Sequence, residues 1–374
     1  MKILLVLFLL TGEDEGSVPP GPFGPGSAPS RLPVYRRGTS LAGGIGHGRS
    51  HGHCTNRQDR SAPVRAVRCS GGLPRVSEEP APSGEGVRVR VASAGICGSD
   101  LHLLSFDMPT ILGHEIAGVL DDGTLVAVEP IAPCHECAPC RNGEYNLCTV
   151  GPDMIMGIGH NGGMADECLV PASSIIAVPS GLSIADACLV EPLAVAVHGV
   201  RRAQVLPHER VAVVGGGSIG QTAVVAAQAT GATVALEARH EAQSQAAERL
   251  GATTMGDGDY DVVIEAAGTG SALARAVELC RPGGRVVLLG SYWDGTVDIP
   301  AYAVSMKEIN LIPSSMYGRV GPSRDFEVAG ALLAARPEVP ETIITHRFPL
   351  DAAAEAFTTA QDRHAGAIKV VLEP

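Results

Sequence analysis

The sequence predicts an α/β protein in which a β-rich domain is joined to a domain with a doubly wound parallel sheet. Three observations predict this fold class. Short apolar strands alternate with helices from Arg210 onward. A strictly alternating strand, Val-Arg-Val-Arg-Val, occupies residues 87–91 among frequent Gly and Pro residues. The chain has 374 residues, about twice the length of a typical single domain.

The chain is acidic and poor in aromatic residues. It carries 28 Lys and Arg against 40 Asp and Glu, a net charge of −12, and only 3% of its residues are aromatic. The first 63 residues hold 7 basic and 4 acidic side chains, so the remaining 311 hold 21 and 36 and carry −15. Such a body repels phosphate backbones, which excludes nucleic acid as the main partner. No apolar run approaches the ~20 residues of a membrane helix, so no membrane contact is expected either.

Residues 1–63 differ in composition from the rest of the chain. They hold eleven Gly and seven Pro with no sustained periodicity, which predicts a disordered, low-complexity extension. The stretch from Ile3 to Leu10 resembles a short signal peptide, but acidic residues follow at once without a small-residue cleavage pattern. We therefore expect a cytoplasmic protein. A further hypothesis places the native start near Val64, because an alternative start codon is read as Val when it is internal.

The elements after the extension fall into two groups with different residue patterns. From Val64 to about Pro192, short strands with frequent Gly and Pro predict the β-rich domain. From Arg210 we expect strands at 211–214, 233–236, 261–264 and 285–289, with helices at 221–230 and 241–250. Continuous apolar strands separated by helices are typical of a parallel sheet covered on both faces. A helix near 352–361 and a strand near 368–372 end the chain.

A glycine-rich loop follows the strand at 211–214 and opens the next helix. It fits the pattern G-x-G-x-x-G, and its pyrophosphate-binding residues are expected to be Gly215, Gly217, Ser218, Ile219 and Gly220. The first glycine allows a tight turn, the second lets the backbone approach the pyrophosphate, and the third permits close packing of helix and strand. The helix N-terminus adds free N–H groups and a positive dipole end.

Glu237 ends the next predicted strand, 17 positions after Gly220. Its carboxylate can accept hydrogen bonds from both ribose hydroxyls of the adenosine and would repel a 2′-phosphate, which favours NAD over NADP. Arg239 favours NADP instead, since its guanidinium can bind that phosphate. The sequence thus predicts NAD as the cofactor and leaves NADP as the alternative.

Four cysteines lie within fifteen residues, in the spacing Cys134-x2-Cys137-x2-Cys140-x7-Cys148. In a chain this long the crowding indicates a metal site rather than a disulfide framework. Four thiolates suit a closed tetrahedral Zn²⁺ site with a structural role. A [4Fe–4S] cluster is the competing metal, but no Pro follows the last Cys and no second cluster motif is present.

Three further motifs are weak separately and specific together: Ala94-Gly-Ile-Cys-Gly-Ser-Asp-Leu-His102, Gly113-His-Glu115 and Glu191-Pro-Leu-Ala-Val-Ala-Val-His198. With the four-cysteine segment and the glycine loop, the chain from Val64 to Pro374 resembles the zinc-dependent medium-chain dehydrogenases, in particular the sorbitol, polyol and threonine dehydrogenase branch. The resemblance implies a GroES-like β-barrel catalytic domain at 64–192, a Rossmann NAD-binding domain at 193–318, and a return to the catalytic domain at 319–374.

The resemblance also implies roles for individual residues. Cys97, His114 and Glu191 would bind a catalytic zinc, and Glu115 would lie beside it and either ligate it directly or exchange with water. That makes two zinc ions per chain. A zinc with three protein ligands keeps a position for the substrate oxygen.

The proton path is likewise implied by the resemblance. Asp100 would orient His114, the usual way a zinc-bound imidazole is fixed. Ser99 would hydrogen-bond the substrate oxygen, and His102 would pass the proton to solvent.

We therefore expect an NAD-dependent zinc dehydrogenase that oxidises a polyol or secondary alcohol, assembled as a homodimer or homotetramer. The alternatives are a simple alcohol or aldehyde reductase using NADP and a non-catalytic NAD-binding protein on the same scaffold. A zinc-ribbon nucleic-acid binder is disfavoured by the acidic body and the complete glycine loop. One departure from the family is the short segment 116–133, which trims the barrel and leaves the shape of the substrate pocket, and so the identity of the alcohol, open.

Overall fold

The computed structural model describes residues 62–106, 108–293, 295–362 and 364–374. The predictions of a disordered extension and a signal-like stretch lie outside these residues. Within them, no helix is both long enough and apolar enough to cross a bilayer. The domain limits at 63/64, 192/193 and 318/319 stay predictions.

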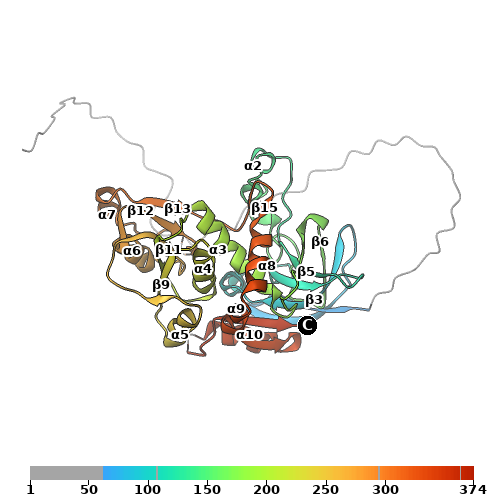
Figure 1. The fold of residues 1–374 in the computed structure, drawn as a ribbon. Helices are drawn as coiled ribbons and strands as arrows, with labels where there is room; N and C mark the ends of the chain where they lie inside the picture. The colour runs from blue at the N-terminus through green and yellow to red at the C-terminus, as the bar shows by residue number, and fades with distance from the viewer. Residues whose placement is uncertain (1–61, 107, 294, 363) are drawn as a thin grey trace, which may run out of the picture. The chain divides into compact units, whose positions relative to one another are not determined.

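A six-stranded sheet forms one half of the described chain, drawn in yellow and orange in Figure 1. All its strands are parallel, in the order β10 (Thr253–Thr254), β9 (Thr233–Glu237), β8 (Arg210–Val214), β11 (Tyr260–Glu265), β12 (Cys280–Leu288), β13 (Asn310–Pro313). The strand order reverses between β8 and β11, and ligands of such sheets bind outside the carboxyl ends of the strands at this point. The prediction of a doubly wound parallel sheet is confirmed.

Both faces of this sheet are covered, because successive side chains of a strand point in opposite directions. Val211 and Val213 of β8 join the apolar core formed with α3 (Val190–Arg202) and α4 (Ser218–Gln228). Ala212 and Val214 join the core formed with α6 (Gly270–Leu279) on the opposite face. The remaining helices of this half are α5 (Glu241–Arg249) and α7 (Ala301–Met306). Helix α4 begins three residues before the predicted start, since the end of the glycine loop is already helical.

The β-rich half is built on a seven-stranded sheet. Its order is β16 (Ile344–Pro349), β17 (Lys369–Glu373), β3 (Val87–Gly95), β4 (Glu115–Val119), β5 (Leu125–Val128), β7 (Ile175–Ala177), with β6 (Glu167–Val170) also paired to β3. Its neighbours are antiparallel except β16 and β17. Strands β16 and β17 come from the end of the chain, so the tail pairs with strands of this half. A hairpin of β1 (Val64–Ser70) and β2 (Leu73–Glu79) lies beside it.

Helices α3 and α8 (Asp325–Ala335) lie between the two sheets in Figure 1. They are joined by the buried carboxylate of Asp325, which accepts hydrogen bonds from His198 Nδ1 at 2.9 Å and from Arg201 Nη1 at 2.6 Å. The backbone N–H of Gly318 donates to the same carboxylate at 2.6 Å. Burial raises the pKa of Asp325, but these donors outweigh it and hold the pKa below its ordinary value.

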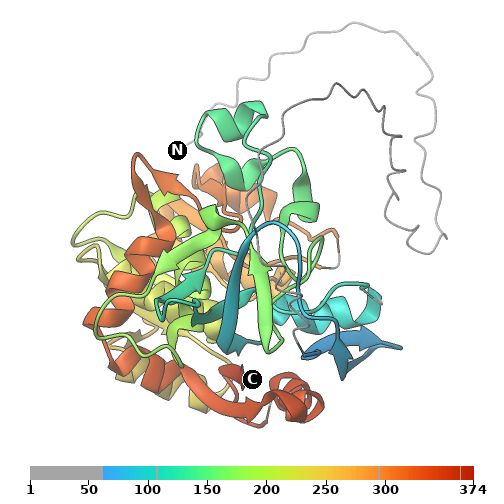
Figure 2. The same cartoon turned by 90° about the vertical axis from the view of Figure 1, so that its right-hand side faces the viewer.

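The other elements are short. The helices are α1 (Gly98–Leu103), α2 (Ala138–Arg141), α9 (Glu338–Ile343) and α10 (Ala353–Gln361), and β14 (Arg319–Val320) pairs with β15 (Ser323–Arg324). Single 3₁₀ turns occupy 104–106, 145–147, 151–154, 172–174, 187–189 and 350–352. Helix α2 and the turns after it stand out from the two sheets in both Figure 1 and Figure 2. This small projection carries the four clustered cysteines.

Candidate functional site

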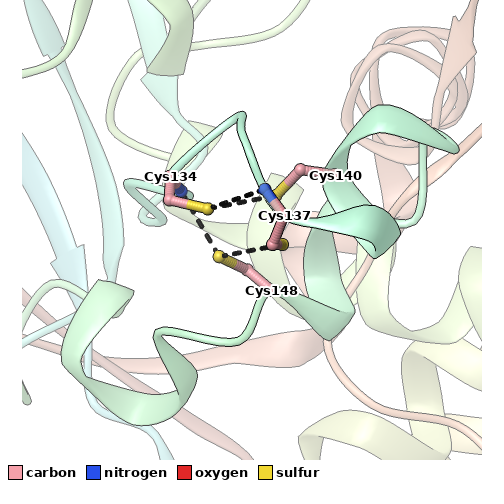
Figure 3. Close-up of side chains that lie close together, drawn as sticks. All are labelled: Cys134, Cys137, Cys140 and Cys148. Carbon is pink, nitrogen blue, oxygen red and sulfur yellow. Dashed lines mark hydrogen bonds between the residues drawn. The ribbon is translucent and has the colours of Figure 1, made fainter.

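The four cysteines predicted as a metal site point toward one another (Figure 3). Their sulfur atoms all lie within 4.8 Å of one another, and the Cys134–Cys140 and Cys137–Cys148 pairs are 4.0 and 3.9 Å apart. Four sulfurs at 2.3 Å from one tetrahedral zinc would be separated by about 3.8 Å, so the donor set fits Zn²⁺ without rearrangement. A closed set of four thiolates leaves no position for substrate, as a structural site requires.

Backbone N–H groups favour the thiolate form of Cys137, whereas burial raises the pKa of the Cys140 thiol to about 12. Hydrogen bonds from the backbone of Thr149 and Cys140 lower the pKa of the Cys137 thiol to about 6. The backbone N–H of Cys137 in turn donates to the sulfur of Cys134 at 3.3 Å, and that of Cys134 donates to the sulfur of Cys148 at 3.3 Å. These donors orient the sulfurs and partly offset the negative charge that four thiolates would concentrate.

The second predicted cluster is organised by the start of α1. Cys97 is the N-cap of this helix, and the Asp100 carboxylate accepts a hydrogen bond from the Cys97 backbone N–H at 2.9 Å. This reciprocal cap fixes the turn Cys97-Gly-Ser-Asp100 and aims Ser99 at the neighbouring His114. Ser99 Oγ lies 3.2 Å from His114 Nε2.

His114 is buried and surrounded by anionic groups. Burial lowers the pKa of its imidazolium, but Asp100, Cys97 and Glu191 outweigh burial and raise it well above the ordinary value. The distance from Nδ1 to Asp100 Oδ1 is 3.6 Å, longer than a hydrogen bond, and neither atom has another hydrogen-bond partner. Asp100 therefore faces His114 without a hydrogen bond at this separation.

Glu115 is engaged by a residue that the sequence analysis missed. Lys369 Nζ donates to Glu115 Oε1 at 2.5 Å, and both side chains are almost fully buried. The other oxygen, Oε2, has no partner. It faces Gly95, where an added Cβ would lie 1.9 Å from it, so a larger residue at that position of β3 would displace the carboxylate.

Glu191 begins α3 and completes the cluster. Burial raises the pKa of its carboxyl group to about 8, and Glu115 and Asp100 add to the effect. Three buried carboxyl groups and a cysteine thus face one buried lysine. This excess of anionic groups, together with the unpartnered atoms of Asp100, His114 and Glu115, fits a divalent cation.

The geometry distinguishes the two clusters. Among the described residues, only the four cysteines bring at least three ligand atoms within 4.8 Å of one another. Cys97, His114 and Glu191 interact electrostatically but are not among the compact ligand groups found in the described residues. Cys188, three residues before Glu191, is fully buried, and burial raises its thiol pKa to about 12.

The glycine loop has the conformation that its spacing predicts. Gly215 adopts φ +114°, and a Cβ on Gly220 would lie 1.8 Å from the Gly215 carbonyl oxygen. A Cβ on Gly217 would meet nothing within 4 Å, so open space lies beside it. Ser218 and Ile219 form the first turn of α4, and the buried Ser218 hydroxyl has no hydrogen-bond partner. The open backbone, the helix N-terminus and this free hydroxyl fit a pyrophosphate group.

Glu237 and Arg239 lie at the carboxyl end of β9, as predicted. The Glu237 carboxylate is bound by Arg275 of α6, with Nε 3.2 and 3.1 Å from its two oxygens and Nη2 2.9 Å from Oε2. Arg239 Nη2 donates to Ser271 Oγ at a longer 3.4 Å. The acidic residue expected to select the cofactor is therefore already paired with a cation.

His102 is exposed and stacks on Trp293, the only tryptophan of the chain. Their ring centroids are 4.9 Å apart with an interplanar angle of 15°. The segment carrying Trp293 is fixed by its neighbour Tyr292, whose hydroxyl donates to the buried Glu265 at 2.7 Å. An aromatic residue from the parallel-sheet half thus holds the predicted relay histidine of the β-rich half.

Comparison with known proteins agrees with these features. The family model of the alcohol dehydrogenase GroES-like domain matches residues 83–180, and that of the glucose dehydrogenase C-terminus matches residues 184–373. An L-galactonate-5-dehydrogenase of Escherichia coli K12 is 31% identical over 75% of this chain and 89% of its own. A sorbitol dehydrogenase of Arabidopsis thaliana is 30% identical over 76% and 87%.

A solved structure of a candidate zinc-binding dehydrogenase from Sinorhizobium meliloti 1021, bound to NADP, shares 30% identity and a TM-score of 0.76. The match covers 84% of this chain and all of that one. The predicted combination of a GroES-like catalytic fold with a parallel nucleotide-binding sheet is confirmed.

Proposed function

The chain belongs to the zinc-dependent medium-chain alcohol dehydrogenase family, and we propose that it oxidises a polyol or related secondary alcohol with NAD as hydride acceptor. Its relatives include dehydrogenases of L-galactonate and sorbitol, substrates that carry secondary hydroxyl groups. The observation that carries the proposal is the cluster of buried His114, Glu115 and Glu191 with half-buried Cys97, next to Ser99. A scaffold without activity would gain nothing from burying so many ionisable groups.

We propose two zinc sites per chain. Cys134, Cys137, Cys140 and Cys148 would hold a structural ion, and Cys97, His114 and Glu191 a catalytic one. Glu115 would be an occasional ligand, because Lys369 occupies one of its oxygens and leaves the other free. When bound, the catalytic zinc polarises the substrate oxygen and the nicotinamide carries the hydride.

The chain's own residues position the substrate and move its proton. The Ser99 hydroxyl, held beside His114 by the cap of α1, is placed to accept the proton of the substrate hydroxyl. Exposed His102, on the same short helix, would transfer that proton to water. Asp100, fully buried against His114, would stabilise the imidazole in the orientation that presents Nε2 to the site.

We propose NAD as the cofactor, with the pyrophosphate on the loop from Gly215 to Gly220 and the adenosine ribose on Glu237. The dense thiol cluster is best maintained in a reducing compartment, which supports a cytoplasmic location. NADP remains the alternative, and the S. meliloti relative binds it.

We propose that the enzyme is a homodimer or a homotetramer in which copies meet along the free edge of β13. Ile299, Tyr302 and Met306, in or just before the helix α7 that precedes β13 in the chain, expose 49%, 81% and 65% of their surface. An exposed apolar edge strand is normally covered by another chain. Sedimentation equilibrium is expected to give a multiple of the 38.4 kDa chain mass, and Met306→Lys should shift the protein toward the monomer. A monomeric wild type would contradict this proposal.

The test of function is a substrate screen with the zinc-replete protein. Reduction of NAD is followed with polyols, threonine, butanediol and simple alcohols, and at least one polyol or secondary alcohol should be oxidised. Turnover only of aldehydes with NADPH would favour the reductase alternative. No turnover at all from protein that holds two zinc ions per chain would favour a non-catalytic role.

A further inference from the structure

The ribose end of the nucleotide site contains more positive charge than its sequence motif suggests. Both oxygens of Glu237 are within hydrogen-bond distance of Arg275, and each side chain is about two-thirds buried. Arg275 is held from its other side by Glu278, with 3.0 Å between Nη1 and Oε2. The guanidinium is therefore fixed in place by two carboxylates from different elements.

A second guanidinium lies at the same end of the sheet. Arg239 follows Glu237 by two residues and donates to Ser271 in the first turn of α6. Arg275 lies one turn further along that helix. One carboxylate, two guanidinium groups and the start of a helix thus surround the place where the adenosine ribose is expected.

We propose that Arg275 determines cofactor selectivity: by pairing with Glu237 it removes most of the repulsion toward a 2′-phosphate, so that the site accepts NADP as well as NAD. This inference rests on the proposed dinucleotide function and deepens it. The paired carboxylate still accepts hydrogen bonds from ribose hydroxyls, since its two oxygens offer about four acceptor sites. The guanidinium groups of Arg275 and Arg239 can in turn bind a phosphate through charge-assisted hydrogen bonds.

The two functions of Arg275 predict opposite responses of the two cofactors to its removal. In Arg275→Gln, an unpaired Glu237 faces the ribose, so NAD binding should hold or tighten. NADP binding should weaken, both because Glu237 repels the phosphate and because a phosphate partner is lost. Since partly exposed ion pairs contribute modestly, we expect the ratio of the two dissociation constants to change about tenfold.

Calorimetric titration of the zinc-loaded enzyme with NADH and with NADPH measures both affinities without turnover. In the wild type the two dissociation constants should lie within about tenfold of each other, and in Arg275→Gln the difference should widen by about tenfold more. Arg275→Lys, which keeps the charge but loses the paired hydrogen bonds, should fall between them. The matched control is Arg281→Gln, because Arg281 binds Asp261 at 2.7 Å at the opposite end of the same sheet. It removes the same charge and should leave the ratio unchanged.

A double-variant cycle isolates the contribution of Glu237. If Arg275 acts by holding that carboxylate, its effect on NADH binding should disappear in a Glu237→Gln background, while part of its effect on NADPH remains. The inference would be overturned if Arg275→Gln had equal effects on NADH binding in both backgrounds, or if the wild type bound NADPH more than about a thousandfold more weakly than NADH. Either result would leave the proposed dehydrogenase function standing. If neither nucleotide binds the wild type, the proposed function itself is wrong.

Discussion

Replacing Cys97 by Ser is expected to lower kcat/KM for alcohol oxidation by about 10³-fold or more, since a metal ion supplies several kcal/mol of transition-state stabilisation. A neutral hydroxyl replaces a thiolate, so the three-ligand site loses both charge and affinity for zinc. Cys97 is partly exposed at the N-cap of α1, its backbone N–H donates to the Asp100 carboxylate, and Ser is itself a favourable N-cap residue. The fold should therefore survive, and the four-cysteine site should keep its ion.

Two variants distinguish loss of the catalytic zinc from other causes of reduced activity. His102→Gln leaves every proposed ligand in place, so zinc content should hold while the rate falls within the range of acid–base groups, about 10²–10⁴-fold or less. Cys69→Ser is the matched control, because Cys69 lies on β1 and its thiol donates to the Leu104 carbonyl, a bond that a hydroxyl can also make. It should retain activity and both ions. A Cys97→Ser protein with two zinc ions and normal turnover would show that Cys97 is not a ligand.

The elements and residues that the sequence predicted are those whose signals are local. The glycine loop, its helix and Glu237 lie within 23 consecutive residues, and each has a conformational requirement that its residue type reveals. The four cysteines are likewise close together, and their spacing alone predicts a tetrahedral site that the sulfur positions fit. Strands β8, β9 and β11 were predicted because their apolar runs need no knowledge of their neighbours.

The partners that the sequence did not reveal come from distant positions. Lys369 reaches Glu115 across 254 residues because β17 pairs with β3 beside β4, and only the sheet order brings them together. Arg275 reaches Glu237 across 38 residues, since α6 follows a strand on the far side of β8. A periodic pattern indicates which face of an element is buried but not what it contacts. The available signal was Lys369 itself, a charge directly before the apolar residues 370–372 of the last strand.

Replacing Cys140 by Ser is expected to remove one zinc ion and lower the free energy of unfolding by at least about 3 kcal/mol, because binding to a structural zinc site is itself folding free energy. The projection that contains this site has little other support. Its helix α2 spans only four residues and buries none of them. Cys148 and Tyr145 pack against the neighbouring apolar core, and two side-chain hydrogen bonds link the projection to other described residues: Tyr145 donates to Glu129 at 2.7 Å and Asn146 to the Ser315 carbonyl at 3.2 Å.

Loss of this zinc ion should unfold the projection before it unfolds the rest of the protein, and proteolysis can detect this local unfolding. Arg141 is exposed at the end of α2, so trypsin should cut after it in Cys140→Ser while the zinc-loaded wild type resists. Cys168→Ser, a buried cysteine of β6 outside both clusters, is the control and should keep the wild-type resistance at Arg141. Mass spectrometry of the fragments, with zinc and iron measured on each protein, gives the result.

Each outcome of this experiment has a separate meaning. Iron in place of zinc would identify the cluster as [4Fe–4S], since the same four thiolates can hold either. Unchanged zinc content with unchanged resistance to trypsin would mean that Cys140 is not a ligand, despite sulfur–sulfur distances that suit one. Zinc loss with a protected Arg141 would mean that the contacts of Tyr145, Asn146 and Cys148 with the rest of the fold hold the projection, and the ion would then be dispensable for the fold.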